Sequence, residues 1–319
     1  MKILIAYDGS ECADAALDDL KRAGLPAVAE VLVLSLADVF LPPNSNRQTD
    51  SEFPLYSSPD VQRAIQGALH RLEEAETWAK RASERINAAF PEWDITYKAR
   101  ADSPAWALIK EADDWKPDLV VMGARGHSVF GGRLILGSVS QRVLYEARCS
   151  VRIARDYRKS KLAAVRIVVG VDHSPDSAKA IEAVRKRDWP KGTEVRLLAV
   201  VDTVMAVPDA GEPSRMKWIE VSDESGRDGV RKVFESDAKK LCEAGLDAAV
   251  MIRRGSPADE ILDEAETWEA DAVFVGAKGM RGIDRLLLGS VSSAIAARAH
   301  CSVEVVRSPA QTSHVGRMN

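Results

Sequence analysis

The chain has 319 residues, enough for about two domains of ordinary size. Its formal net charge of -4 gives no basic field for nucleic acid, and a composition with 46% hydrophobic and 29% charged residues is that of a globular protein. No apolar run reaches the ~20 residues of a membrane span, the opening MKILIAYDGS is not a signal peptide, and the 4 cysteines form no CxxC motif, so we expect a cytoplasmic protein with reduced thiols and no membrane contact.

The first half of the chain alternates short apolar runs with amphipathic segments. Residues 3–7 and 30–36 are apolar runs that predict two buried strands. Asp8-Gly9-Ser10 predicts a turn whose serine caps the following helix, and residues 38–59, rich in Pro, Ser and Asn, predict a long loop. The remaining predicted elements are an amphipathic helix over 60–89, an outer strand over 95–100, a helix from Ser103-Pro104, a strand over 119–122, a helix over 138–147 and a strand over 151–154.

The second half repeats the first. KILIAYDGS at 2–10 returns as RIVVGVDHS at 166–174, and three later blocks return in the same order. This internal duplication of alternating strands and helices predicts an α/β fold with two tandem doubly wound five-stranded parallel sheets. We expect a first domain over 1–157, a second over 163–308 and a flexible tail over 309–319. The later blocks are PDLVVMGARG (117–126) with ADAVFVGAKG (270–279), LILGSVS (134–140) with LLLGSVS (286–292), and RCSVRIAR (148–155) with HCSVEVVR (300–307).

Two strand ends in each half carry residues suited to a ligand. The first strand ends at Asp8 or Asp172, and the fourth ends at Gly123 or Gly276. Ligands of open α/β sheets bind beyond the carboxyl ends of the strands, so neighbouring strands would place the acid and the glycine in one crevice. The loops after the fourth strand, GARGHSVFGGRLILGS and GAKGMRGIDRLLLGS, each end in a Gly-Ser that begins a helix. Glycine N–H groups and a helix N-terminus favour an anion, which predicts a phosphate cradle.

The machinery of efficient phosphoryl transfer is not visible in the sequence. There is no Gly-Lys-Ser/Thr, no acid in a metal-holding pattern, and no catalytic triad shared by the halves, so we expect no enzyme and no catalytic or metal-ligating residues. Plainer roles stay open: Asp8 and Asp172 as turn formers, and Arg125 and Lys278 as solvated cations. The equivalent Cys149 and Cys301 predict buried thiols.

The second loop has the spacing Gly276, Gly279, nine residues, Gly289, Ser290, which resembles the nucleotide-binding signature of the universal stress protein family. The opening strand-Asp-Gly-Ser and the closing Cys-Ser-Val-x-x-x-Arg resemble the same family, and the resemblance covers residues 1–307. The first loop departs from the pattern, because ten residues separate Gly126 from Gly137.

The resemblance implies an adenine nucleotide, ATP or ADP or AMP, with Mg²⁺ compatible with ATP. It also implies adjacent first and fourth strands, pairing of the last strands (151–154 with 303–306), and room for a further homodimer. The loop chemistry and the resemblance together give these candidate nucleotide-binding residues: Asp8, Leu36, Met122, Gly123, Arg125, Gly126, Gly137, Ser138, Val139 and Ser140 in the first half, and Asp172, Val200, Val275, Gly276, Lys278, Gly279, Gly289, Ser290, Val291 and Ser292 in the second.

The first functional hypothesis is an ATP-binding sensor or regulator of the stress response, with slow hydrolysis at most and regulatory protein partners of unknown identity. The second is a partner-binding module whose nucleotide sites are vestigial, which the longer first loop favours. The third is an adenylating α-hydrolase-type enzyme; AYDGSECAD and GVDHSPDSA lack the paired glycines of that class, which disfavours it.

Overall fold

The computed structural model describes residues 1–39, 41, 58–125, 136–155, 164–201, 204–208, 216–220, 224–279 and 288–307, with the backbone alone described at 204–208, 216–220 and 224–227. Most of the loop predicted over 38–59 and the predicted tail lie outside these residues, as do the exact domain boundaries. No helix in the described part of the chain has the length and apolar character to cross a membrane.

The first unit has the predicted elements in the predicted order. Ser10 caps the first helix by accepting the N–H of Ala13 at 3.2 Å, and Pro104 stands at the start of the third helix as predicted. The elements are β1 (Lys2–Ala6), α1 (Glu11–Asp19), the 3-10 turn η1 (Leu20–Arg22), β2 (Glu30–Ala37), α2 (Pro59–Ala89), β3 (Asp94–Ala101), α3 (Pro104–Trp115), β4 (Leu119–Gly123), α4 (Ser138–Glu146) and β5 (Ser150–Ala154).

The second unit repeats this scheme with one addition that the sequence analysis missed. A separate antiparallel hairpin, β8 with β9, follows the second strand of the unit. Both of its strands are short, and neither VMAVP nor MKWIE alternates strictly between apolar and polar residues, so the sequence signal is weak. The elements are β6 (Arg166–Val171), α5 (Pro175–Arg185), β7 (Glu194–Val201), β8 (Val204–Pro208), β9 (Met216–Glu220), α6 (Glu224–Glu243), β10 (Asp247–Arg254), α7 (Pro257–Thr267), β11 (Ala272–Gly276), α8 (Ser290–Arg298) and β12 (Ser302–Val306).

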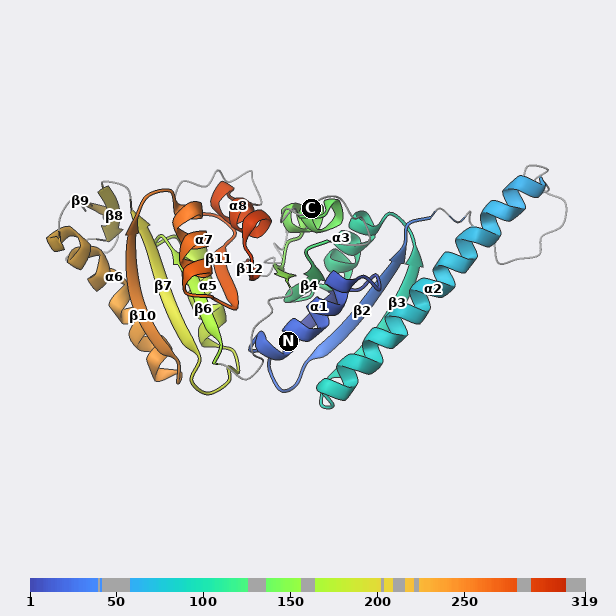
Figure 1. Ribbon diagram of the computed structural model, residues 1–319, viewed down its shortest axis with the longest axis horizontal. Coiled ribbons are helices and arrows are strands. Elements are labelled where there is room, and N and C mark those ends of the chain that lie inside the picture. The colour runs from blue at the N-terminus through green and yellow to red at the C-terminus, as the bar shows by residue number, and fades with distance from the viewer. Residues whose placement is uncertain are drawn as a thin grey trace, which may run out of the picture.

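The two five-stranded sheets join into one sheet of ten strands, in the order β10-β7-β6-β11-β12-β5-β4-β1-β2-β3. Within each unit's part of this sheet all pairs are parallel, and β3 and β10 are the outer strands. The join is the antiparallel pair of β5 and β12, with Val151 opposite Val305 and Ile153 opposite Val303. The predicted pairing of the last strands is therefore confirmed, and the two units lie side by side along the sheet (Figure 1).

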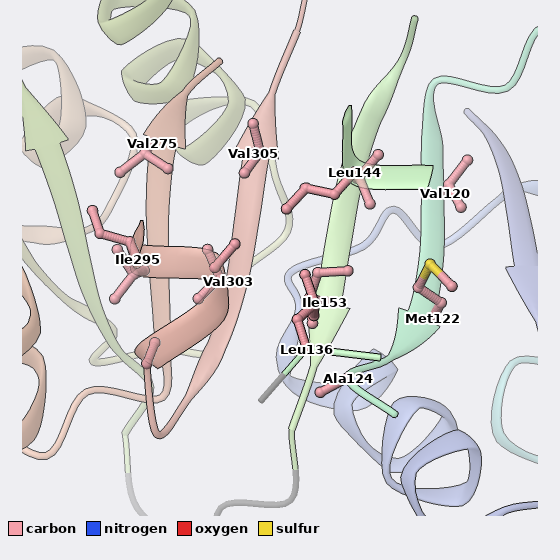
Figure 2. Close-up of a cluster of buried hydrophobic side chains, with 14 of the residues drawn as sticks. Val120, Met122, Ala124, Leu136, Leu144, Ile153, Val275, Ile295, Val303 and Val305 are labelled. Atoms are coloured by element: carbon pink, nitrogen blue, oxygen red, sulfur yellow. The ribbon is translucent and has the colours of Figure 1, made fainter. Parts of the chain in front are cut away.

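Helices cover both faces of the sheet, as a doubly wound fold requires. On one face α1 with α2, and α5 with α6, cover the strands of their own unit through separate apolar clusters. On the other face α3, α4, α7 and α8 share one cluster that is continuous across the β5–β12 join. Figure 2 shows Leu144 and Ile153 of the first unit beside Val303 and Val305 of the second within this cluster. On this face the two units therefore bury a common core, whereas on the opposite face each unit has its own.

Each unit also has a buried glutamate beneath its outer strand. Glu264 on α7, 1% exposed, contacts the guanidinium groups of Arg196 and Arg253, the latter at 2.6 Å. Burial opposes its charge, but the hydrogen bonds from both arginines outweigh burial and hold the pKa of Glu264 below its ordinary value. Glu111 on α3 occupies the same place in the first unit, with Lys98 at 2.8 Å and Arg100 at 2.9 Å.

We expect Glu264→Gln to lower the free energy of unfolding by about 1.5–3 kcal/mol at neutral pH, because the hydrogen bonds to a charged acceptor are lost. Since the folded state depresses the pKa of Glu264, its contribution is complete above the unfolded value of 4.5 and falls as the pH drops below it. The gap between wild type and variant should therefore narrow between neutral pH and acid in denaturant titrations. The exposed Glu235→Gln is the control, and a gap independent of pH would contradict the assignment.

Candidate functional site

The structure places the predicted residues of each unit at one edge of the sheet. Strand β1 pairs with β4, and β6 pairs with β11, so the predicted adjacency of first and fourth strands is confirmed. The strand order reverses at these two pairs, which makes each of them the topological switch point of its unit. Asp8 and Gly123 therefore lie at one carboxyl edge, and Asp172 and Gly276 lie at the equivalent edge of the second unit.

Both aspartates form the turn that leads into the following helix. Asp8 Oδ1 accepts the N–H of Ser10 at 3.1 Å and its hydroxyl at 2.6 Å, and Asp172 Oδ1 accepts the N–H of Ser174 at 3.0 Å. The turn-forming role that the sequence left open is thus present in both units. A contact with nucleotide remains a prediction for these two residues.

The residue after each aspartate has a positive φ, +76° at Gly9 and 65° at His173. Glycine is needed at the first position for a second reason, because a Cβ there would lie 2.9 Å from the Trp78 ring. In the second unit the ring of His173 instead meets Phe234 edge-on at 6.1 Å. The equivalent turns are therefore covered by different aromatic groups from α2 and α6.

The glycines that end β4 and β11 are required by packing against a helix start. A Cβ on Gly123 would lie 2.6 Å from the carbonyl oxygen of Cys12, and one on Gly276 would lie 2.5 Å from the carbonyl carbon of Asp176. Gly279 has a different neighbour, since its Cβ would lie 2.6 Å from Asp172 Oδ2. The glycine loop and the acid of the second unit are therefore in contact distance. Gly126, the matching glycine of the first loop, lies outside the described residues.

The loops return to helices that begin at the sheet edge. Gly137 and Gly289 are the N-cap residues of α4 and α8, and their N–H groups donate to the carbonyls of Ala124 at 2.8 Å and Ala277 at 2.7 Å. Ser138 and Ser290, the first residues of these helices, are exposed. The first residues of both helices are thus exposed at the carboxyl edge of the sheet, where the orphan N–H groups of a first turn attract anions.

Ser140 and Ser292, which are among the predicted nucleotide-binding residues, have a role inside the protein. Both are buried, and their hydroxyls donate to the carbonyls of Gly123 at 2.9 Å and Gly276 at 2.6 Å. Each hydroxyl has one hydrogen, so the bond that joins helix to strand end uses the donor that a phosphate would need.

We expect Ser292→Ala to lower the free energy of unfolding by about 1–2 kcal/mol, because a buried carbonyl loses its partner. Ser290→Ala should leave stability within ~0.5 kcal/mol of wild type, since that side chain is exposed. Thermal or denaturant unfolding of the two variants measures this difference. Equal effects from both would contradict the structural role of Ser292.

An acid in the first turn of α5, Asp176, contacts the second loop and was missed by sequence reasoning. Asp176 Oδ2 accepts the backbone N–H of Lys278 at 3.1 Å, and Oδ1 accepts from Lys179 Nζ at 2.6 Å. The Ser174 hydroxyl also donates to the Lys278 carbonyl at 3.3 Å. The aligned position in the first unit is Cys12, which has no carboxylate. Alignment of Asp8-x-x-x-Cys12 with Asp172-x-x-x-Asp176 could have revealed this difference from the sequence. The extra carboxylate makes the candidate site of the second unit chemically different from that of the first.

The apolar residues among the nucleotide-binding candidates lie where the core meets the edge of the sheet. Met122 and Val275 are buried in the shared cluster, and Leu36 and Val200 are partly buried against it (Figure 2 shows Met122 and Val275). Val139 and Val291 are likewise partly buried against this core. Arg125 and Lys278 are half-buried at the loop starts. These apolar side chains and the helix start therefore lie at the same edge of the sheet in each unit.

The arginines that close the two Cys-Ser-Val-x-x-x-Arg stretches, the buried Arg155 and the partly buried Arg307, connect the units. Arg155, after β5, donates to the carbonyl of Ala296 in the last turn of α8 and to that of Cys301 at 3.5 Å. Burial lowers the pKa of Arg155 to about 10, and Arg307 makes the equivalent contacts with α4. Arg155 of the first unit thus caps the C-terminus of α8 in the second unit, and Arg307 of the second unit caps the C-terminus of α4 in the first. The N-terminus of each capped helix lies at the carboxyl edge of the sheet in its own unit.

The equivalent cysteines are buried thiols, as predicted. Burial raises the pKa of Cys149 to about 11 and that of Cys301 to about 12. Neither sulfur is in a disulfide. Both thiols are therefore protonated at neutral pH.

The chain is a tandem α/β protein with two doubly wound units that join through their last strands. Each unit has a glycine loop and a helix start at its topological switch point. The chain belongs to the universal stress protein family, whose sequence model matches residues 1–155 and again residues 165–307.

Individual relatives agree with this membership. The universal stress protein MJ0531 of Methanocaldococcus jannaschii is 35% identical over 145 residues, covering 44% of this chain and 78% of that protein. Universal stress protein YxiE of Bacillus subtilis is 30% identical over 147 residues, covering 44% of this chain and 98% of YxiE. The crystal structure of a universal stress protein from Archaeoglobus fulgidus has the same fold, with a TM-score of 0.62 at 23% identity over 96% of this chain and 98% of that one.

Proposed function

We propose that this chain binds ATP, or a related adenine nucleotide, at its two carboxyl-edge crevices, with Mg²⁺ accompanying ATP. In this proposal it acts as a nucleotide-dependent sensor or regulator of the stress response, with slow hydrolysis at most and no efficient catalysis. Protein partners would read the bound state.

The observation that carries the proposal is the convergence of groups in the second unit. Asp172, Gly279 and the start of α8 come from three separate segments and meet at the switch point between β6 and β11. An acid suits a ribose or adenine donor, whereas a helix start suits a phosphate, so the polarity of the edge matches a nucleotide. Membership of the universal stress protein family supports the same reading.

The test is direct. The purified protein is denatured and the released small molecules are chromatographed, and the nucleotide-free protein is titrated with ATP and, as a control, GTP. Release of an adenine nucleotide, or ATP binding at or below millimolar concentration, is the expected result. No release and no binding would defeat the proposal.

A second candidate is a partner-binding module whose nucleotide sites are vestigial. The internal bonds of the Ser140 and Ser292 hydroxyls and of the Lys278 N–H favour it, because these donors are already satisfied within the protein. Replacing Gly289 and Ser290 by bulky residues separates the candidates. Unaltered partner binding and cellular phenotype in that variant would favour the second one.

If phosphate occupies the second loop, the Asp176 carboxylate beside Lys278 opposes it electrostatically. We expect Asp176→Asn to tighten ATP binding by the second unit several-fold, and Cys12→Asp to weaken binding by the first unit. Calorimetric titration of both variants with ATP measures the change in affinity. The exposed Asp228→Asn, which removes the same charge elsewhere, is the control for Asp176→Asn. Tighter binding in the control as well would show a general charge effect rather than a local one.

A further inference from the structure

The residues at the centre of the join between the units are opposite in charge. Arg152 on β5 and Glu304 on β12 occupy the same position in the two copies, within RCSVRIAR and HCSVEVVR. They also face each other directly in the antiparallel pair. The pseudo-twofold axis that relates the halves therefore passes between these two residues. In a pairing of two identical halves, the residue at this position would face its own copy.

Several other contacts of the join would fit identical halves equally well. Ser150 Oγ contacts the N–H of Arg307 at 3.1 Å, and Ser302 Oγ contacts that of Arg155 at 3.1 Å. The helix caps that Arg155 and Arg307 make are equivalent, and the facing strand residues next to the axis are all aliphatic. These contacts stabilise the join without distinguishing one half from the other.

The central charges do distinguish the halves. Arg152 and Glu304 are each 1% exposed, and Arg152 Nη1 lies 3.3 Å from Glu304 Oε2. Arg152 also binds Asp19 of its own unit through two bonds of 2.5 and 3.0 Å, and Glu304 binds Arg187 of its own unit. The four side chains form a buried row of alternating charge. At the positions aligned with Asp19 and Arg187, the other copies carry Ala183 and Ala23.

We propose that the Arg152–Glu304 pair determines the pairing specificity of this join. The edge strand of a first half accepts the edge strand of a second half and rejects another first half. Two first halves would place two buried guanidinium groups together, and two second halves would place two buried carboxylates together. Both arrangements lose the central attraction and gain a repulsion in a site that excludes water. The chain therefore closes on itself instead of linking to like halves of other chains.

The test uses full-length chains with one charge reversed, Arg152→Glu and Glu304→Arg. In each variant alone, the two halves carry like charges at the axis, so the closed monomer should unfold at lower denaturant concentration than wild type. Refolded together, the two variants can place a glutamate opposite an arginine only between chains. The expected result is a one-to-one heterodimer of twice the wild-type mass by light scattering. The exposed exchanges Lys191→Glu and Glu235→Arg, refolded together, are the control and should stay monomeric.

A neutral variant provides a second test if the reversed chains do not fold. The variant replaces all four charged side chains of the row: Asp19→Ala, Arg152→Met, Arg187→Ala and Glu304→Met. Alanine is chosen at 19 and 187 because the aligned positions of the other half carry Ala183 and Ala23. Refolded over a range of protein concentrations, the neutral variant should form dimers whose fraction rises with concentration, because like halves are no longer rejected. The proposal would be overturned if the charge-reversed chains unfolded at the same denaturant concentration as wild type and formed no heterodimer. It would also be overturned if the neutral variant stayed as monomeric as wild type at every protein concentration.

Discussion

Arg152→Ala is expected to lower the free energy of unfolding by about 3–5 kcal/mol, the effect of removing one partner from a buried ion pair. The arginine is 1% exposed, and its loss leaves the carboxylates of Asp19 and Glu304 buried with one partner fewer. Arg187 remains beside Glu304, but Asp19 keeps only the hydroxyl of Ser302 at 2.8 Å among the bonds described. Denaturant unfolding at neutral pH measures the loss.

The neutral four-residue variant is the informative comparison for this prediction. Replacing a whole buried ionic cluster by apolar residues is often neutral or stabilising, whereas removing one member is not. We therefore expect that variant to be more stable than Arg152→Ala. If Arg152→Ala unfolded within ~0.5 kcal/mol of wild type, the row would be less important to the join than its burial suggests.

Gly279→Val is expected to remove ATP binding from the second unit, with an affinity loss of more than about tenfold. A Cβ at this position would lie 2.6 Å from Asp172 Oδ2, so the side chain displaces the carboxylate and fills the gap between it and the glycine loop. The residue is exposed, so the stability loss should be limited to about 0.5–1.5 kcal/mol, the contribution of the turn bond that the displaced Asp172 carboxylate makes with Ser174. In calorimetric titration, the number of ATP sites per chain should fall by one.

Two other glycines control this prediction. Gly67 on α2 has open space around its Cβ, so Gly67→Ala should bind ATP normally and be stabilised by up to about 1 kcal/mol. Gly276→Ala should be destabilised by about 1–3 kcal/mol, because the Cβ meets the backbone of Asp176 at 2.5 Å. Wild-type stoichiometry and affinity in Gly279→Val would contradict the proposed place of the nucleotide.

Much of the fold was predictable because it depends on local pattern and repetition. The apolar run at 3–7 and the helical spacing over 60–89 gave elements that the structure has within one or two residues at each end. The aligned blocks predicted the duplication itself. The join of the last strands and the adjacency of the first and fourth came from the family resemblance, and both are confirmed. The β8–β9 hairpin was missed because two short strands give little periodic signal.

The place of the candidate residues in the fold was predictable, but their contacts within the protein were not. The glycines at 123 and 276 look like phosphate ligands in the sequence, yet helix starts pack against them. The Ser140 and Ser292 hydroxyls look like phosphate donors, yet they tie each helix to a strand end. Such roles depend on contacts between segments that are distant along the chain, and a linear motif contains no information about these contacts.

The sequence by itself determined that this protein is a duplication with a glycine loop and an acid in each half, because repetition and spacing are linear properties. Only the tertiary structure decided that Asp176 bonds one loop while Cys12 stands at the other, and that each unit caps the other's helix. It also decided that Arg152 meets Glu304 at the axis, since a pair related by symmetry becomes adjacent only when the two halves are brought together in space.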